Sequence, residues 1–166
     1  MECSIRAAAL HDLPAIDTLS NEVLREYGLP EDSAVAERDA AYFEPTGAVT
    51  RGRGQFWVAE CACGLIGSAA VVPWSDSVCL MKTFYVSRAY RKRGIGYRLL
   101  EECERLARAS GYAAIELYTS RRFHRAIELY TRNGYALVEA LDNPWDDNIY
   151  RKPLDALPCS LTDTFS

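Results

Sequence analysis

Apolar residues recur every three or four positions in three segments of the chain, the spacing that places them on one face of an amphipathic helix. The first segment follows Asp12, which can cap a helix, and ends at Gly28. The second begins at about Gly94 and stops at Gly111, and the third is the stretch "RRFHRAIELYTRNG", closed by its Asn-Gly pair. The pattern therefore predicts three amphipathic helices.

Apolar and alternating stretches between these segments predict strands. "QFWVAECACGLIGSAAVVP" gives two strands joined by a tight turn at Cys63-Gly64, and "SVCLMKTFYV" gives a third, so an antiparallel meander is expected. "AAIELYT" follows a helix and should lie parallel to the strand before it, through a right-handed crossover. "YALVEAL" and "NIYRKPL" give the last two strands, and Ser4 to Arg6 give a short first one.

The resulting order is β-α-α-β-β-β-α-β-α-β-β, which describes an α+β domain with one mixed sheet. Its second helix is short and is read, together with a loop, from "LPEDSAVAERDAAYFEPTG". Such loops often shape the entrance for a substrate. Residues 1–154 are predicted to form a single domain, and residues 155–166, which show no periodicity, a loosely ordered C-terminal tail.

The composition, with 49% hydrophobic and 25% charged residues, is typical of a soluble globular protein. The longest apolar run, "GLIGSAAVV", is too short to cross a bilayer, and the amino terminus makes a poor signal peptide, so a cytoplasmic protein without membrane contact is predicted.

The six cysteines are interpreted as free thiols, because Cys79 and Cys103 fall at apolar positions. "CAC" lacks the gap of a CxxC motif and the chain has two histidines, so no metal site is predicted.

Positive charge is concentrated in one turn of an otherwise acidic chain. Five basic residues and no acidic one lie between Arg88 and Arg98, whereas the rest of the chain holds 14 basic and 23 acidic residues. The turn joins a strand that ends at Val86 to a helix, whose unpaired N–H groups and dipole favour an anion. Gly94 and Gly96 let a bulky anion approach the backbone. These features favour a phosphate site, with a solvated basic turn as the alternative.

Other polyanion-binding patterns fit the turn poorly. A Walker loop is absent, and the dinucleotide fingerprint needs a third glycine where Leu99 stands. Nucleic-acid binding is not predicted either, because the basic residues are confined to one turn and no aromatic residues are interleaved in a stacking pattern.

Two motifs resemble those of a known family, the GCN5-related N-acetyltransferases or GNAT superfamily. "RKRGIG" at residues 91–96 is similar to the family signature [Q/R]-x-x-G-x-[G/A], and the preceding "FYVSRAY" to the family's strand end. "AIELYTRNGY" is similar to the later A-x-x-L-Y-x-x-x-G-[F/Y] segment, at the expected distance. The resemblance covers approximately Ser4 to Leu154. It implies a GNAT fold, with a central mixed, mostly antiparallel β-sheet flanked by helices and splayed between its fourth and fifth strands.

The resemblance also implies that acetyl-CoA, the acyl donor, lies across this split with its pyrophosphate on the backbone amides of Lys92 to Tyr97. The main chain of Phe84 to Val86 would pair with the pantetheine arm, and the Val86 N–H would stabilise the oxyanion. Ser120 could replace a hydrogen bond from an asparagine that is frequent in the family, since Phe123 stands at that position. The implied cofactor-binding residues are Phe84, Tyr85, Val86, Arg91, Lys92, Arg93, Gly94, Ile95, Gly96, Tyr97, Ser120 and Arg125.

Acyl transfer also needs an acid for the departing thiolate and a way to remove a proton from the amine. Tyr130 matches the family's tyrosine acid, with simple packing on the sheet as its alternative role. No carboxylate stands near Cys79, where family members often carry a glutamate base. Glu116 and Glu60 are therefore the candidate bases, each with a surface role as the alternative, and a water chain is a third route. His124 is interpreted as a surface or capping residue.

Acidic residues gather around the predicted entrance and should attract a cation. They are Glu26, Glu31, Asp32, Glu37, Asp39 and Glu44. The sequence thus predicts an N-acetyltransferase that moves an acetyl group from acetyl-CoA directly to a small primary amine, without a metal, as a monomer or homodimer. Two alternatives stay open, namely an acetyltransferase for protein lysines or amino termini, and a catalytically silent module that senses acyl-CoA.

Overall fold

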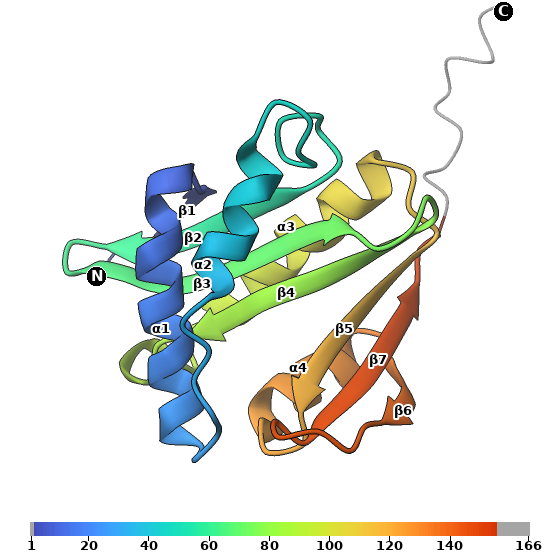
Figure 1. The fold of residues 1–166 in the computed structure, drawn as a ribbon. Helices are drawn as coiled ribbons and strands as arrows, with labels where there is room; N and C mark the ends of the chain where they lie inside the picture. Colours follow the sequence, from blue (N-terminus) through green and yellow to red (C-terminus); the bar gives the residue numbers. More distant parts are fainter. Residues whose placement is uncertain (1, 156–166) are drawn as a thin grey trace, which may run out of the picture.

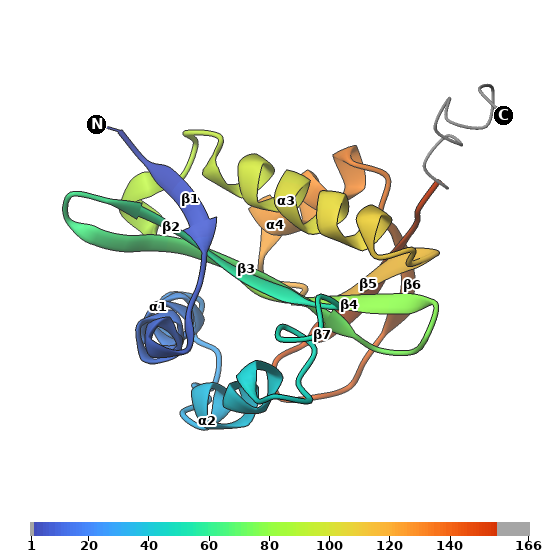
Figure 2. The same cartoon turned by 90° about the horizontal axis from the view of Figure 1, so that it is seen from above.

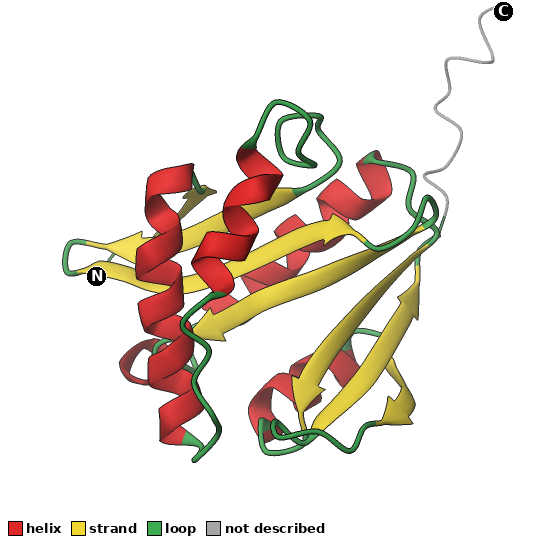
Figure 3. Cartoon of the chain, in the orientation of Figure 1, coloured by secondary structure: helices red, strands yellow, loops and turns green. Residues whose placement is uncertain are grey.

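The computed structural model describes residues 2–155, which form one seven-stranded sheet in the order β1-β2-β3-β4-β5-β7-β6. The strands are β1 (Ser4–Ala7), β2 (Gln55–Cys61), β3 (Gly64–Pro73), β4 (Val78–Val86), β5 (Ala114–Ser120), β6 (Ala136–Ala140) and β7 (Asp147–Pro153). The helices are α1 (Leu13–Glu26), α2 (Val35–Asp39), α3 (Ile95–Ala109) and α4 (His124–Arg132). Figure 1 shows this order along the chain, and Figure 3 shows the helices flanking the sheet.

Helices cover both faces of the sheet. Seen from above, α1 and α2 lie on one face, and α3 and α4 on the other (Figure 2). All neighbouring strands are antiparallel except β4 and β5, which are parallel and are connected through α3. The predicted order of elements, the α+β class and the mixed, mostly antiparallel sheet are therefore confirmed. The predicted loose tail, apart from its first residue, lies outside the described residues.

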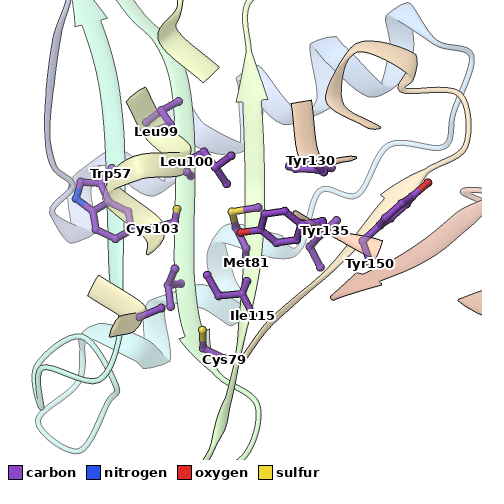
Figure 4. Packing of buried hydrophobic residues seen from close by; sticks show 14 of the residues in the cluster. Trp57, Cys79, Met81, Leu99, Leu100, Cys103, Ile115, Tyr130, Tyr135 and Tyr150 are labelled. Carbon is purple, nitrogen blue, oxygen red and sulfur yellow. The ribbon is translucent and has the colours of Figure 1, made fainter. Parts of the chain in front are cut away.

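Each helical layer has its own apolar core. On one face α1 contributes Leu13 and Ile16, which pack against Phe56 and Val58 of β2. On the other face the core is larger, and it includes the residues labelled in Figure 4, namely Trp57, Cys79, Met81, Leu99, Leu100, Cys103, Ile115, Tyr130, Tyr135 and Tyr150. The second core joins both halves of the sheet to α3 and α4, so it fixes the place where β4 and β5 meet.

Two local expectations are corrected. The Asp12 side chain makes no bond to the first turn of α1; it accepts the Ala9 N–H at 2.7 Å and binds Arg6 through both oxygens, because a short 3-10 turn precedes the helix. The turn between β2 and β3 consists of Ala62 and Cys63 rather than Cys63 and Gly64. The five described cysteines are free thiols.

Candidate active site

The sheet splits within β4. Only residues Val78 to Met81 pair with β5, opposite Ala114 to Leu117. The register with β3 shifts between Ser68 and Ala70, where β4 contains one extra residue, Thr83, at φ +50°. Such a bulge bends a strand, and beyond it β4 stays paired with β3 but leaves β5.

The bulge leaves main-chain groups of β4 facing the split. The Ser87 N–H bonds to the Ile66 carbonyl on β3 at 2.8 Å. Because successive N–H groups of a strand point to opposite sides, the Val86 N–H points away from β3, toward the split. The Val86 carbonyl accepts a hydrogen bond from Arg91 Nε at 3.1 Å. The Val86 N–H is thus a fixed donor at the edge of the split, as an oxyanion site needs.

The amino terminus of α3 lies next to it. Gly94 is the N-cap of α3, with φ +79° and no side chain that could block the first turn. The N–H groups of Ile95, Gly96 and Tyr97 have no acceptor within the helix, whereas the Arg98 N–H already bonds to the Gly94 carbonyl at 3.1 Å. A Cβ on Gly96 would lie 3.4 Å from Leu129 of α4, so glycine lets the two helices approach closely. The free N–H groups and the helix dipole favour a phosphate here.

A cavity of about 660 Å³ connects the split with this helix terminus. Its walls include Val23 of α1 and Tyr27 directly after that helix, and also Leu129 and Arg132 from α4. Since α1 and α4 cover opposite faces of the sheet (Figure 2), the cavity passes through the sheet at the split. Ten of the predicted cofactor-binding residues line it: Phe84, Tyr85, Val86, Arg91, Lys92, Gly94, Ile95, Gly96, Tyr97 and Arg125.

The α1 end of the cavity is aromatic. The ring of Phe123 lies 4.9 Å from that of Tyr27 and 6.4 Å from that of Tyr85, both edge-on. Burial raises the pKa of Tyr85, and the nearby carboxylates of Asp147 and Asp32 raise it further. This end of the cavity is therefore walled by three aromatic rings.

Arg91 does not lie free in the cavity. Its Nη1 and Nη2 bind the Glu26 carboxylate at 2.6 and 2.8 Å, and its side chain is only 16% exposed. Together with the bond to Val86, these contacts join the end of α1 to the end of β4. The hydrogen bond from Arg91 holds the pKa of Glu26 below its usual range. Arg91 is thus neutralised by Glu26, which reduces its direct attraction for phosphate.

Tyr130 is not among the residues that line the cavity; it belongs to the core on the face that α3 and α4 cover (Figure 4). Its ring is 5.6 Å from Phe84 and 5.7 Å from Tyr135, and the residue is 3% exposed. Burial raises the pKa of its hydroxyl well above the ordinary value, so the phenol is protonated at neutral pH. Tyr130 therefore has the protonation state of an acid and packs against Phe84, which lines the cavity.

The remaining candidates lie outside the lining of the cavity. Glu116 binds Arg151 at 2.9 Å. Glu60 binds Arg6 at 2.9 Å at the edge of the sheet that β1 forms. The buried Ser120 hydroxyl accepts the Arg122 N–H at 3.2 Å. These three side chains thus have partners within the protein. His124 is exposed at the start of α4, as the sequence suggested.

Arg93 also lies outside the lining, with its guanidinium 5.2 Å from the centre of the Tyr90 ring.

Sequence reasoning missed the bulge and the aromatic end. Thr83 interrupts a strand whose apolar pattern continues on both sides, and the only signal is the polar pair Lys82-Thr83 within "CLMKTFYV". Tyr27 and Phe123 stand at helix boundaries, 96 positions apart, so only the fold brings their rings together.

Among residues 2–155, no group of three or more His, Cys, Asp or Glu side chains could hold a metal ion. No helix of the same range is long and apolar enough to span a bilayer.

Known proteins match this architecture. Residues 52–137 match the model of the acetyltransferase (GNAT) domain family. The chain is 26% identical to the uncharacterized N-acetyltransferase YjgM of Escherichia coli (strain K12) over 138 residues, covering 81% of this chain and 83% of that protein. It is 27% identical to N-acetyltransferase family 8 member 3 of Rattus norvegicus over 112 residues, covering 64% of this chain and 49% of that protein.

Solved structures show the same fold. An acetyltransferase of the GNAT family from Staphylococcus aureus Mu50 superposes with a TM-score of 0.80 at 18% identity, covering 93% of this chain and all of that one. The yncA protein of Salmonella typhimurium, solved with its cofactor acetyl-CoA, gives 0.75 at 19% identity, covering 96% of this chain and 99% of that one. The GNAT fold predicted from the two motifs is thus confirmed, and the chain is an acyltransferase that belongs to the GNAT acetyltransferase family.

Proposed function

We propose that this protein transfers the acetyl group of acetyl-CoA to the primary amine of a small molecule, by direct attack in a ternary complex. One observation supports this most strongly: the cavity passes through the sheet, with a helix terminus suited to a phosphate at one end and an aromatic pocket at the other. Two substrates could therefore enter from opposite faces and meet beside the Val86 N–H.

The residues present fit acetyl-CoA. The pyrophosphate would bind the N–H groups from Lys92 to Tyr97, helped by the charge of Arg125 at the cavity wall. The pantetheine arm would pair with the main chain from Phe84 to Val86, which β5 leaves unpaired. Two structures of the same fold were solved with this type of ligand, yncA with acetyl-CoA and the paiA N-acetyltransferase of Thermoplasma acidophilum with coenzyme A, the latter with a TM-score of 0.68.

The chemistry then depends on three groups of this chain. Acetyl-CoA supplies the activated acyl group. The Val86 N–H would bind the oxygen that becomes negative as the amine attacks, and Arg91 would act indirectly, by holding the Val86 carbonyl. Tyr130 would protonate the thiolate that leaves. Glu116 and Glu60 each have a cationic partner, so we favour solvent at the aromatic end as the acceptor of the amine proton. Glu116→Gln tests this choice, because an inactive variant would restore Glu116 as the base.

The aromatic end supports a small acceptor with an apolar body. Tyr27, Tyr85 and Phe123 can pack on a ring or branched alkyl group, and the faces of their rings can bind an ammonium group. A cytoplasmic location, and a monomer or homodimer, remain predictions.

A panel of amines with acetyl-CoA and a thiol-release readout tests the proposal. We expect turnover with aryl- or alkylamines, less with polyamines and amino acids, and least with lysine-containing peptides. Turnover with peptides alone would favour the protein-directed alternative. Calorimetric binding of acetyl-CoA without turnover on any amine would contradict the transferase proposal and favour a sensor.

A further inference from the structure

The tight turn between β2 and β3 holds two thiols close together. Cys61 is the last residue of β2 and pairs with Gly64, and Cys63 is the second residue of the intervening turn. Cys63 is exposed and Cys61 is half-buried. Both therefore lie where a small reagent in solution can reach them.

One hydroxyl connects both thiols to the cofactor cavity. The Tyr90 Oη lies 2.6 Å from the Cys63 Sγ and 3.7 Å from the Cys61 Sγ. Tyr90 ends the 3-10 turn Arg88–Tyr90 that precedes the phosphate-binding segment, and it lines the cavity. The Arg93 guanidinium lies over the ring of Tyr90. The thiol pair is thus joined by hydrogen bonds to the segment on which acetyl-CoA binding depends.

The surroundings make Cys61 the more reactive type of thiol. The hydrogen bond from Cys63 lowers the pKa of Cys61, and the N–H groups of Cys63 and Gly64 and the Tyr90 hydroxyl lower it further. A lower pKa raises the fraction of thiolate, the nucleophilic form. Burial has the opposite effect elsewhere, since it raises the pKa of Cys79 to about 12 and that of Cys103 well above the ordinary value. These two core thiols serve as internal controls.

We propose that Cys61 and Cys63 form a reversible disulfide when a peroxide oxidises them, and that this modification weakens acetyl-CoA binding through Tyr90. The Cys61 thiolate attacks one peroxide oxygen, an S–O bond forms, the O–O bond breaks, and one water leaves after protonation. The Cys63 sulfur then attacks the Cys61 sulfenic acid and displaces a second water. Two thiols and one hydrogen peroxide thus give one disulfide and two waters, with two electrons passing from sulfur to oxygen.

The disulfide changes the contacts of Tyr90. It brings the two sulfurs to about 2 Å and removes both S–H donors. The Tyr90 hydroxyl then loses its thiol partners, so the ring is held less firmly and its cation–π contact with Arg93 becomes weaker. A bridge within so short a turn is also strained, which favours reversal by a thiol reductant.

The test uses the full chain, reduced and then treated with stoichiometric hydrogen peroxide. Remaining thiols are alkylated and mapped by mass spectrometry, and acetyl-CoA affinity is measured by calorimetry before oxidation, after oxidation and after reduction. We expect a Cys61–Cys63 bridge, unmodified Cys79 and Cys103, and a Kd raised roughly three- to tenfold, the change that loss of one hydrogen bond gives. Reduction should restore the original Kd. The mapping is independent of amine turnover, so it stands even if the proposed acceptor is wrong.

Variants separate the effect of the Cys61–Cys63 disulfide on the acetyl-CoA Kd from the effect of other oxidation. Cys61→Ser and Cys63→Ser each keep a hydroxyl for Tyr90 but cannot form the bridge, so peroxide should leave their Kd unchanged. Tyr90→Phe should bind acetyl-CoA more weakly already when reduced, and oxidation should add little. Cys3→Ser is the matched control, since Cys3 lies beside Cys61 in a shallow depression, and it should respond like the parent protein.

Three results would overturn the proposal. They are a bridge from Cys61 to Cys3 or to another cysteine, peroxide-resistant thiols at both positions, and a Cys61–Cys63 bridge that leaves the acetyl-CoA Kd unchanged.

Discussion

The two halves of β4 share one neighbour and differ in the other. Both pair with β3, but Val78 to Met81 also pair with β5, whereas the residues after Thr83 face the cavity. The first half is paired with a strand on each side and buries Cys79 and Met81 in the core. The second half keeps donors free, such as the Val86 N–H. One strand can therefore belong to the core and line a cavity at once, and the change between the two halves takes a single extra residue.

This contrast predicts that substitutions around the open half alter catalysis or binding, whereas those in the paired half alter stability. Tyr130→Phe should show the largest effect. If the hydroxyl protonates the leaving thiolate, kcat should fall roughly 10²- to 10⁴-fold, the usual contribution of general acid catalysis. The acetyl-CoA Kd and the melting temperature should change little, because the ring keeps its packing against Phe84 and Tyr135.

The pH dependence checks the same role. Burial raises the pKa of Tyr130, so its phenol should stay protonated above the ordinary tyrosine value of about 10. We expect no loss of kcat between pH 8 and 10 in the parent protein. An unchanged kcat in Tyr130→Phe would leave the residue with a packing role only.

Met81→Ala tests the paired half. Met81 is 2% exposed and lies where β4 and β5 last pair. Truncation of a buried methionine typically costs about 2–5 kcal/mol of unfolding free energy, which denaturant titration would measure. Provided that the variant is folded, its acetyl-CoA Kd should stay within twofold of the parent value. A loss of affinity as large as the loss of stability would mean that the two halves of β4 are not independent.

Gly94→Val tests the proposed phosphate site at the start of α3, which adjoins the open half of β4. Gly94 has φ +79°, which strains a β-branched residue by about 1–3 kcal/mol, and a distorted turn should weaken acetyl-CoA binding roughly tenfold or more. Gly111→Val is the matched control, because Gly111 follows the other end of α3, has φ +80°, and likewise has no atom within 4 Å of an added Cβ. Both variants should lose similar stability, and only Gly94→Val should lose affinity. Equal Kd values would argue against binding at this helix terminus.

Sequence patterns predicted the parts of this comparison that depend on local chemistry. Helix periodicity, the glycines of the turn and the "AIELYTRNGY" segment identified the elements and the motif positions. They could not predict that Arg91 binds Glu26, 65 positions away, because that contact depends on how α1 packs against the sheet. Sequence patterns also could not predict the bulge at Thr83, because threonine favours extended strands and rarely adopts a positive φ.

Thr83 itself provides the smallest and most specific test. Its Oγ1 is buried without a hydrogen-bond partner, and its φ of +50° is strained for a β-branched residue. Thr83→Gly relieves both costs but gives the unfolded chain more freedom, so we expect unfolding free energy to rise by up to about 1 kcal/mol. Thr83→Val keeps the strain and removes only the hydroxyl, which isolates the cost of the unpaired oxygen.

Acetyl-CoA titrations of both variants then sharpen the comparison between the halves of β4. If the bulge alone separates the halves, Thr83→Gly and Thr83→Val should bind acetyl-CoA within twofold of the parent protein. A loss of affinity in both variants, with stability gained, would mean that the Thr83 hydroxyl finds its partner in the ligand. The strained backbone at Thr83 would then serve to position its hydroxyl for the ligand, and not only to bend the strand. The open half of β4 would contribute a side chain as well as main-chain groups to acetyl-CoA binding.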